Sequence, residues 1–224
     1  MLCMKSKLHL LWDMDGTLVN SEPEILSTIE KSLDSVGVSI DNASAKLRIG
    51  PPVKDVIRNA FPQAILSDEQ LEEVVKEFRL IYDTSDYVYT EPYDGIDTLI
   101  HDSHFVHHVI TNKPFFATNR ILKAKGWDGC VAEVITPDSL LEVHGMRMTK
   151  PEMFRYCRSA NPDVPMVGIG DMTVDAESAI DAEIIAIGVL WGTGTRNELE
   201  DARCHYLVES TNQLKDLLYN LSNE

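Results

Sequence analysis

The stretch that decides the fold reads LHLLWDMDGTL and spans residues 8–18. Its first five residues, from Leu8 to Trp12, are almost all apolar, which is typical of a β-strand buried on both faces of a parallel sheet. Two carboxylates, Asp13 and Asp15, follow the strand directly. Because ligands bind at the carboxyl ends of parallel strands, we expect this stretch to be the first strand of an α/β protein with a polar site at its end.

Four later runs of the chain share this apolar character. They span residues 107–110, 131–135, 166–169 and 184–190. Helical patterns lie between most of them; between the first two runs, for example, Ala117, Ile121 and Ala124 recur at helical spacing. This alternation predicts an α/β fold with a Rossmann-like parallel-sheet core. The tail from Thr211 to Leu221 is expected to form a closing amphipathic helix.

The interval from residue 20 to residue 90 differs, because it holds no convincing strand. Ser21 with Glu24, and Ser67 with Gln70, each form the pattern of a capping box at the start of a helix. Apolar residues at helical spacing follow both starts. We therefore predict an all-helical domain over residues 20–90, inserted after the first strand of a core domain made of residues 1–19 and 91–224.

The chain has 224 residues, with 20 Lys and Arg against 36 Asp and Glu, so its formal net charge is −16. An acidic chain repels nucleic acid and anionic membrane surfaces, so we expect neither as a partner. No apolar run approaches the ~18 residues of a transmembrane helix. The four cysteines are scattered without a CxxC pair, which favours reduced thiols. We expect a cytoplasmic protein, and the sequence leaves its oligomeric state open between monomer and dimer.

Four polar clusters lie at or near the ends of the predicted strands. They are residues 13–18, 111–114, 150–151 and 168–175. The parallel topology lets all four converge on one edge of the sheet. The carboxylates of Asp13, Asp15 and Asp171 come without His or Cys, which favours an oxygen-ligated ion such as Mg²⁺ over zinc. A carboxylate beside Mg²⁺ can act as a nucleophile on phosphorus, so the pattern indicates phosphoryl transfer.

In this order, the motifs DxDGTL at 13–18, TN at 111–112, KP at 150–151 and GDxxxD at 170–175 resemble the four motifs of the haloacid dehalogenase superfamily. The resemblance covers essentially the whole chain. It implies a Mg²⁺-dependent phosphatase that works through an aspartyl-phosphate, with Asp13 as nucleophile and Asp15 as general acid and base. It also implies that the helical insertion is a type-1 cap, which closes over the site. Asp15 argues against the metal-free dehalogenases, which lack a carboxylate at that position.

The resemblance also assigns the remaining residues of the site. The implied metal ligands are the Asp13 carboxylate, the Asp15 main-chain carbonyl and Asp171. The implied phosphate-binding residues are Thr111, Asn112 and Lys150. Asp175 and Thr17 are implied as supporting residues, with Asp175 either behind the metal or orienting Lys150.

Secondary signatures resemble phosphoglycolate phosphatases. They are TNKP at 111–114, IGPP at 49–52 and GVLWG at 188–192. The expected substrate is a small phosphorylated metabolite, with 2-phosphoglycolate first, and Lys113 and Arg48 are expected to contact it. A phosphosugar mutase of the β-phosphoglucomutase type, and a pyrophosphatase or nucleotidase on the same scaffold, remain open alternatives. A non-catalytic binding protein on this fold is a further alternative.

Two other features receive structural interpretations. Four histidines, His101, His104, His107 and His108, gather at the start of a predicted strand, at the end away from the polar clusters. We expect exposed imidazoles there rather than a metal site. Trp191 is expected to pack at the rim of the polar site.

Overall fold

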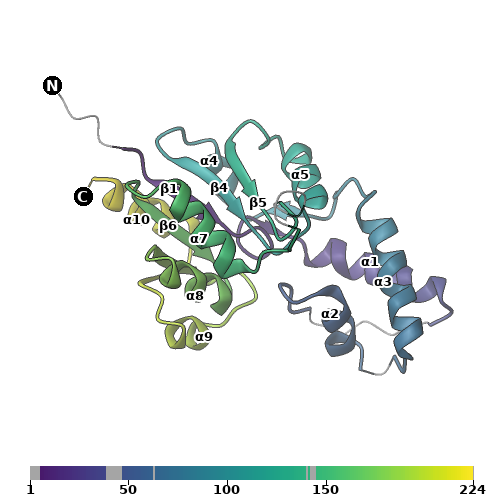
Figure 1. Ribbon diagram of the computed structural model, residues 1–224. Helices are drawn as coiled ribbons and strands as arrows, with labels where there is room; N and C mark the ends of the chain where they lie inside the picture. The colour runs from purple at the N-terminus through teal and green to yellow at the C-terminus, as the bar shows by residue number, and fades with distance from the viewer. Residues whose placement is uncertain (1–5, 39–46, 63, 140, 142–144, 224) are drawn as a thin grey trace. The chain divides into compact units, whose positions relative to one another are not determined.

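The computed structural model describes residues 6–38, 47–62, 64–139, 141 and 145–223. The chain divides into two compact units, one of Met1–Val19 with Pro92–Glu224 and the other of Asn20–Glu91. Figure 1 shows the first unit as a sheet with flanking helices and the second as a group of helices. The first unit contains all four polar clusters.

The first unit is built on a six-stranded sheet with the strand order β5-β4-β1-β6-β7-β8. Its strands are β1 (His9–Trp12), β4 (Val106–Ile110), β5 (Val131–Ile135), β6 (Met166–Gly170), β7 (Ile185–Val189) and β8 (Tyr206–Val208). All adjacent strands pair in parallel, which confirms the α/β fold with a parallel sheet. The edge strand β8 escapes prediction because only Val208 of its three residues is buried.

β1 is the central strand, and its last three residues, Leu10 to Trp12, have no exposed surface. It pairs with β4 on one side and with β6 on the other, so that His9 lies opposite both Val106 and Met166. The chain therefore builds the sheet outward from β1 in two directions. A ligand crevice forms at such a switch point, outside the carboxyl ends of the strands, and the residues that follow β1 occupy this position.

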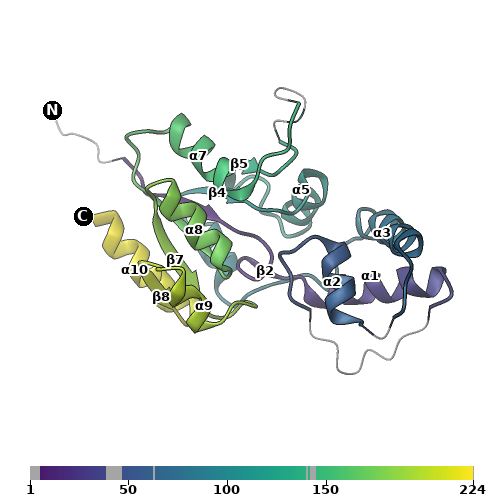
Figure 2. The same cartoon turned by 60° about the horizontal axis from the view of Figure 1, so that its bottom comes forward.

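Helices α7 (Lys150–Ala160) and α8 (Thr173–Asp181) cover one face of the sheet (Figure 2). Phe154 of α7 and Ala179 of α8 pack in one buried cluster with Leu11. Gly168 of β6 permits this approach, because a methyl group there would overlap both Phe154 and Ala179. Further helices of this unit are α4 (Ile96–Ile100), α5 (Phe115–Ala124), α9 (Arg196–Asp201) and α10 (Thr211–Asn223). The last of these is the predicted closing helix.

The second unit consists of α1 (Glu22–Ser35), α2 (Val53–Ala60) and α3 (Asp68–Tyr82), with α1 packed against α3. The two chain crossings between the units form short paired strands, β2 (Val19–Asn20) and β3 (Glu91–Pro92). Two-residue strands carry no apolar run, so the sequence pattern predicts only the helices. That this unit is a cap over the site stays a prediction. Within the described ranges, no helix is both long and apolar enough to span a bilayer.

The two predicted capping boxes have different outcomes. At α3, the main-chain N–H of Gln70 donates to Ser67 Oγ, and the Ser67 N–H donates to the Gln70 side chain, so this box is confirmed. The box predicted at α1 is wrong. The buried Glu24 carboxylate instead accepts hydrogen bonds from Ser85 Oγ at 2.5 Å and from the Tyr89 N–H at 2.8 Å. These bonds tie α1 to the segment that follows α3.

Replacing Phe154 by Ala tests the packing of α7 on the sheet. Phe154 is 1% exposed, so its truncation should leave a cavity and lower the free energy of unfolding by about 3–5 kcal/mol. Tyr156→Ala on the same helix is the matched control, because that side chain is 37% exposed and should cost about 1 kcal/mol or less. Urea unfolding followed by circular dichroism measures both, and equal losses would contradict the packing described.

Candidate functional site

The four polar clusters lie at the carboxyl edge of the sheet, around the end of β1. Asp13 directly follows β1, Thr111 follows β4 and Asp171 follows β6. Lys150 is the first residue of α7. These neighbouring strand ends bring together side chains that are far apart in sequence, as the parallel topology predicts.

Lys150 is a buried cation of this site. A capping box between Thr149 and Glu152 fixes the first turn of α7, with Thr149 N donating to Glu152 Oε2 at 2.7 Å. From this turn the Lys150 ammonium, 3% exposed, donates to Asp13 Oδ1 at 2.6 Å and forms an ion pair with Asp175. A buried ammonium is tolerated only with such partners, so the two aspartates and Lys150 hold one another in place.

Burial sets the protonation of these groups. It raises the pKa of Asp13 to about 7, although the Lys150 ammonium acts to lower it. Burial, together with the nearby Asp13 charge, raises the pKa of Asp171 to about 6. For Lys150, burial alone would lower the pKa, but the Asp13 and Asp175 carboxylates outweigh burial and raise it. Positive charge added near these carboxylates would favour their ionised forms.

Asp171 is fully buried and accepts hydrogen bonds at both carboxylate oxygens. Thr17 Oγ1 donates to Oδ1 at 3.2 Å, while Thr193 donates to Oδ2 through its main-chain N–H at 2.7 Å and its Oγ1 at 3.1 Å. Gly16 and Gly192 leave room for this carboxylate, because a methyl group on either would overlap it. Gly16 also has a φ of 84°, in the left-handed region that favours glycine.

Thr193 is a residue of this site that the sequence analysis missed. It lies in the loop after β7, between Gly192 and Gly194. A Gly-Thr-Gly sequence at the carboxyl end of a predicted strand is a signal that could have found it, because glycines there let the backbone approach another group closely. Trp191 packs beside the site as expected, with its indole N–H donating to the Thr17 carbonyl at 3.0 Å.

Lys113 is another buried cation at this edge, and its ammonium lies 3.1 Å from Asp15 Oδ2. Thr111 shapes the turn that presents it, because the Lys113 N–H donates to Thr111 Oγ1 at 3.2 Å. Asn112 is exposed in the same turn. Arg48 is exposed and belongs to the second unit, so its predicted contact with a substrate stays a prediction.

The charges at this edge suit a divalent cation. Four carboxylates face two buried ammonium groups, which leaves two negative charges in excess within the group when all four carboxylates are ionised. The carboxylates are those of Asp13, Asp15, Asp171 and Asp175, and the ammonium groups are those of Lys113 and Lys150. Asp13, Asp171 and Asp175 each offer an oxygen within 4.8 Å of the others. A purely oxygen donor set of this kind fits Mg²⁺.

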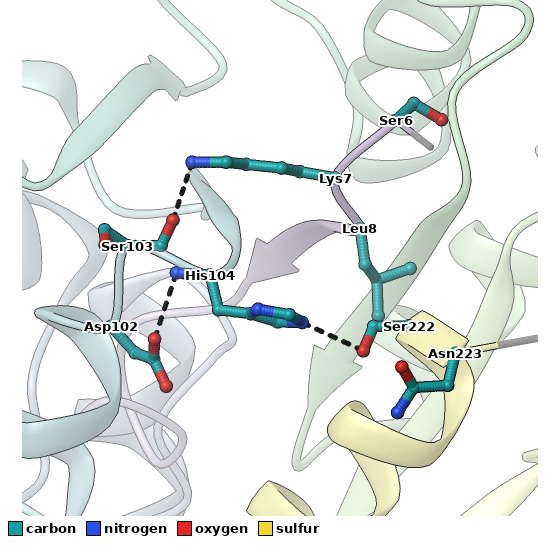
Figure 3. Close-up of a pocket in the computed structure, with 8 residues that line it drawn as sticks. All are labelled: Ser6, Lys7, Leu8, Asp102, Ser103, His104, Ser222 and Asn223. Carbon is teal, nitrogen blue, oxygen red and sulfur yellow. Dashed lines mark hydrogen bonds between the residues drawn. The ribbon is translucent and has the colours of Figure 1, made fainter. Parts of the chain in front are cut away.

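A separate pocket opens at the opposite end of β1 (Figure 3). Its walls come from the residues before β1, the turn between α4 and β4, and the end of α10. A hydrogen bond of 3.1 Å between His104 Nε2 and Ser222 Oγ joins two of these walls. None of the predicted site residues lines this pocket, so it is distinct from the carboxyl edge.

The expectation of exposed imidazoles is wrong for two of the four histidines. His107 and His108 are 3% and 4% exposed, because β4 lies in the interior of the sheet and helices cover it. Their side chains alternate between the two faces. On one face His107 Nδ1 accepts a hydrogen bond of 3.1 Å from the Trp12 indole. His101 and His104 are exposed as expected.

Thr193→Val tests the hydrogen bonds that hold Asp171. This isosteric change removes one hydroxyl donor to a buried carboxylate, and it should lower the free energy of unfolding by about 1–2 kcal/mol. Thr193→Ser keeps the hydroxyl and is the matched control, with an expected loss of less than about 1 kcal/mol. Urea unfolding compares the two. A Val variant as stable as the wild type would show that the main-chain donor alone satisfies the carboxylate.

Comparisons with known proteins identify the family of this chain. The family model of haloacid dehalogenase-like hydrolases matches residues 10–189. A phosphoglycolate phosphatase from Xylella fastidiosa is 28% identical over 191 residues, which cover 82% of this chain and 80% of that protein. The pyrophosphatase PpaX from Anoxybacillus flavithermus is 26% identical over 215 residues, which cover 93% of this chain and 95% of that protein.

A solved structure of a candidate phosphatase from Clostridium difficile is also similar, with a TM-score of 0.81 and 25% identity. The superposition covers 96% of this chain and 99% of that one. The expected superfamily, its fold and an enzyme of the phosphatase type are thereby confirmed. Since the family model spans most of the sequence, from β1 to the end of β7, the chain belongs to the haloacid dehalogenase-like hydrolase family.

Proposed function

We propose that this hydrolase is a Mg²⁺-dependent phosphatase of small phosphomonoesters that works through an aspartyl-phosphate on Asp13. The observation that carries the proposal is the buried pairing of Asp13 with Lys150 beside Asp171 and Asp175. A nucleophilic carboxylate next to a fixed ammonium and further carboxylates is the arrangement that phosphoryl transfer to an aspartate requires.

The proposed hydrolysis proceeds through two successive displacements at phosphorus. A carboxylate oxygen of Asp13 attacks the phosphorus, and the bond from phosphorus to the ester oxygen breaks as Asp15 gives that oxygen a proton. Asp15 then takes a proton from water, whose oxygen attacks the phosphorus and releases inorganic phosphate and the free Asp13 carboxylate. Lys150 holds Asp13 in position and neutralises charge that develops on the phosphoryl oxygens. Thr111 and Asn112 donate hydrogen bonds to those oxygens.

The proposed metal ligands are the Asp13 carboxylate, the main-chain carbonyl of Asp15 and Asp171. Mg²⁺, when bound, supplies positive charge that offsets the repulsion between a carboxylate nucleophile and an anionic substrate. Thr17 and Thr193 keep Asp171 oriented through their hydrogen bonds. Asp175 acts through Lys150, which it contacts directly.

Phosphoglycolate is the proposed substrate within this class. The phosphoglycolate phosphatase from Xylella fastidiosa that resembles this chain supports it, and so does the buried ammonium of Lys113 at the carboxyl edge. An ammonium there can pair with the carboxylate of an acidic substrate. In this proposal the helical unit, through Arg48, caps the site, and the protein acts on free metabolites in the cytoplasm.

Pyrophosphate is the second candidate substrate, because the chain also resembles the pyrophosphatase PpaX from Anoxybacillus flavithermus over nearly its full length. The two candidates differ chemically at one point, since only phosphoglycolate carries a carboxylate. A panel that measures phosphate release from phosphoglycolate, pyrophosphate, nucleotides and hexose phosphates separates them. Isomerisation of a sugar 1-phosphate without phosphate release would instead indicate a mutase.

Asp13→Asn is the decisive test of the mechanism. It removes the nucleophile with little change in shape, and kcat should fall by at least about 1,000-fold with Mg²⁺ present. The exposed Asp216→Asn on α10 is the matched control and should keep full activity. Treatment of the wild type with a chelator should abolish turnover, and Mg²⁺ should restore it. An Asp13→Asn protein that is folded by circular dichroism and fully active would refute the proposal.

Lys113→Met tests the proposed contact with a substrate carboxylate. The KM for phosphoglycolate should rise by about 10-fold or more, because the lost ion pair is a charge-assisted contact. The KM for ethyl phosphate, which has no carboxylate, should change much less. Equal effects on both substrates would show that Lys113 acts on Asp15 instead of on the substrate.

A further inference from the structure

A second group of potential ligands lies inside the sheet, away from the proposed phosphatase site. His108 on β4, Glu133 on β5 and Cys157 on α7 each offer one donor atom within 4.8 Å of the others. His9 on β1 stacks on His108, with ring centroids 4.9 Å apart. We call these four residues the histidine–cysteine cluster. His108 is three residues before Thr111, or about 10 Å along the strand from the carboxyl edge.

The donors are mostly buried, and the pairing of His108 with Glu133 on neighbouring strands places these two side chains on one face of the sheet. His108 is 4% exposed and Cys157 has no exposed surface. The side chain of Glu133 is 39% exposed, so the cluster is reached from solvent along this residue. Residues of the same strands that share this face, among them Ile110 and Ile135, pack against α7 together with Cys157. His108 and Cys157 therefore lie in the packed interior between the sheet and α7, while Glu133 lies at its border with solvent.

His108 is oriented for ligation by its hydrogen bond to His9. Its Nε2 lies 2.9 Å from His9 Nδ1. When Nε2 carries the proton, it donates to His9 and leaves the Nδ1 of His108 as a lone pair. This Nδ1 is buried, has no hydrogen-bond partner, and lies 3.7 Å from Glu133 Oε2. A histidine that binds a metal through one nitrogen usually donates a hydrogen bond from the other nitrogen in this way.

An ion pair between His108 and Glu133 does not account for the arrangement. Burial, together with the neighbouring histidines, lowers the pKa of His108 to about 4, so the imidazole is neutral at neutral pH. The contact with Glu133 then lacks both a charge pair and a hydrogen bond. An unsatisfied buried nitrogen of this kind costs free energy unless something binds it.

The spacing of the donors matches a small tetrahedral site. With the bond lengths of zinc to nitrogen, oxygen and sulfur ligands, the edges of the tetrahedron are about 3.4–3.6 Å. The separation between His108 Nδ1 and Glu133 Oε2 is already 3.7 Å. A mixed set of imidazole, carboxylate and thiolate donors disfavours Mg²⁺ and Ca²⁺, and it suits a borderline metal ion.

We propose that the histidine–cysteine cluster is a zinc site, in which His108 Nδ1, Glu133 and the Cys157 thiolate bind the ion and water completes the coordination. Binding displaces the Cys157 proton to solvent. The ion would join β4, β5 and α7 from within. This inference is independent of the proposed phosphatase function, because it shares no residue with that site.

Cobalt substitution tests the proposal on the full chain. The protein is stripped with a chelator, reduced, supplied with excess Mg²⁺ and titrated with Co²⁺ as a spectroscopic stand-in for zinc. A thiolate bound to Co²⁺ gives a near-ultraviolet charge-transfer band, and tetrahedral Co²⁺ gives intense visible bands. We expect both in the wild type, saturating at one equivalent of Co²⁺ and lost when Zn²⁺ is added in excess. Absence of the thiolate band would overturn the proposal.

Matched variants assign the ligands. Cys157→Ser and His108→Gln should lose the thiolate band, or weaken cobalt binding at least 10-fold, while Cys204→Ser and His107→Gln should keep the band. In parallel, Zn²⁺ should raise the thermal unfolding midpoint of the wild type but not that of Cys157→Ser. Circular dichroism and Mg²⁺-dependent turnover confirm that each variant is folded. A band that persists in Cys157→Ser would also overturn the proposal.

Discussion

The carboxyl edge of the sheet depends on the buried ammonium group of Lys150. Lys150 lies between Asp13 and Asp175, which come from the end of β1 and the first turn of α8. Each of the three charges would be costly in a buried position without the others. Because the partners come from three elements, the ion pairs form only when α7, α8 and the end of β1 are correctly placed relative to one another. Phe154 of α7 and Ala179 of α8 pack against Gly168 of β6 and share a buried cluster with Leu11 of β1, and this packing holds the elements in position.

The ammonium groups also offset the repulsion between the carboxylates at this edge, so that these can lie close together. A buried and uncompensated group of four aspartates would shift towards protonation, because burial, and to a smaller extent the neighbouring carboxylates, raise the pKa values of Asp13 and Asp171. Lys150 and Lys113 offset half of the charge, and the remainder favours a divalent cation. The net charge of −16 is thus no obstacle to binding an anionic phosphate, because the local field at this edge is set by a few fixed groups.

The sequence predicts the strands and the motif residues of the site well, but it does not predict interactions that depend on how distant segments fold together. Strand β5 begins and ends at the predicted residues, because a short run rich in Val and Ile is typical of a strand. The motif residues Asp13, Lys150 and Asp171 are predictable because strand ends of a parallel sheet converge. The Gly-Thr-Gly sequence marks Thr193 as a candidate, but its hydrogen bonds to Asp171 depend on a loop conformation that only the folded backbone defines. The predicted capping role of Glu24 is wrong because its carboxylate accepts a hydrogen bond from Tyr89, a residue far along the chain.

The central position of β1 has a consequence for biosynthesis. β1 leaves the ribosome before both of its partners, β4 and β6, whose pairing with it begins at Val106 and Met166. At roughly 5–20 residues per second, β1 waits on the order of ten seconds before both of its edges can be covered. During that interval its apolar residues and unpaired main-chain groups are open to wrong partners. The nascent chain should therefore depend on chaperones more strongly than the stability of the finished sheet suggests.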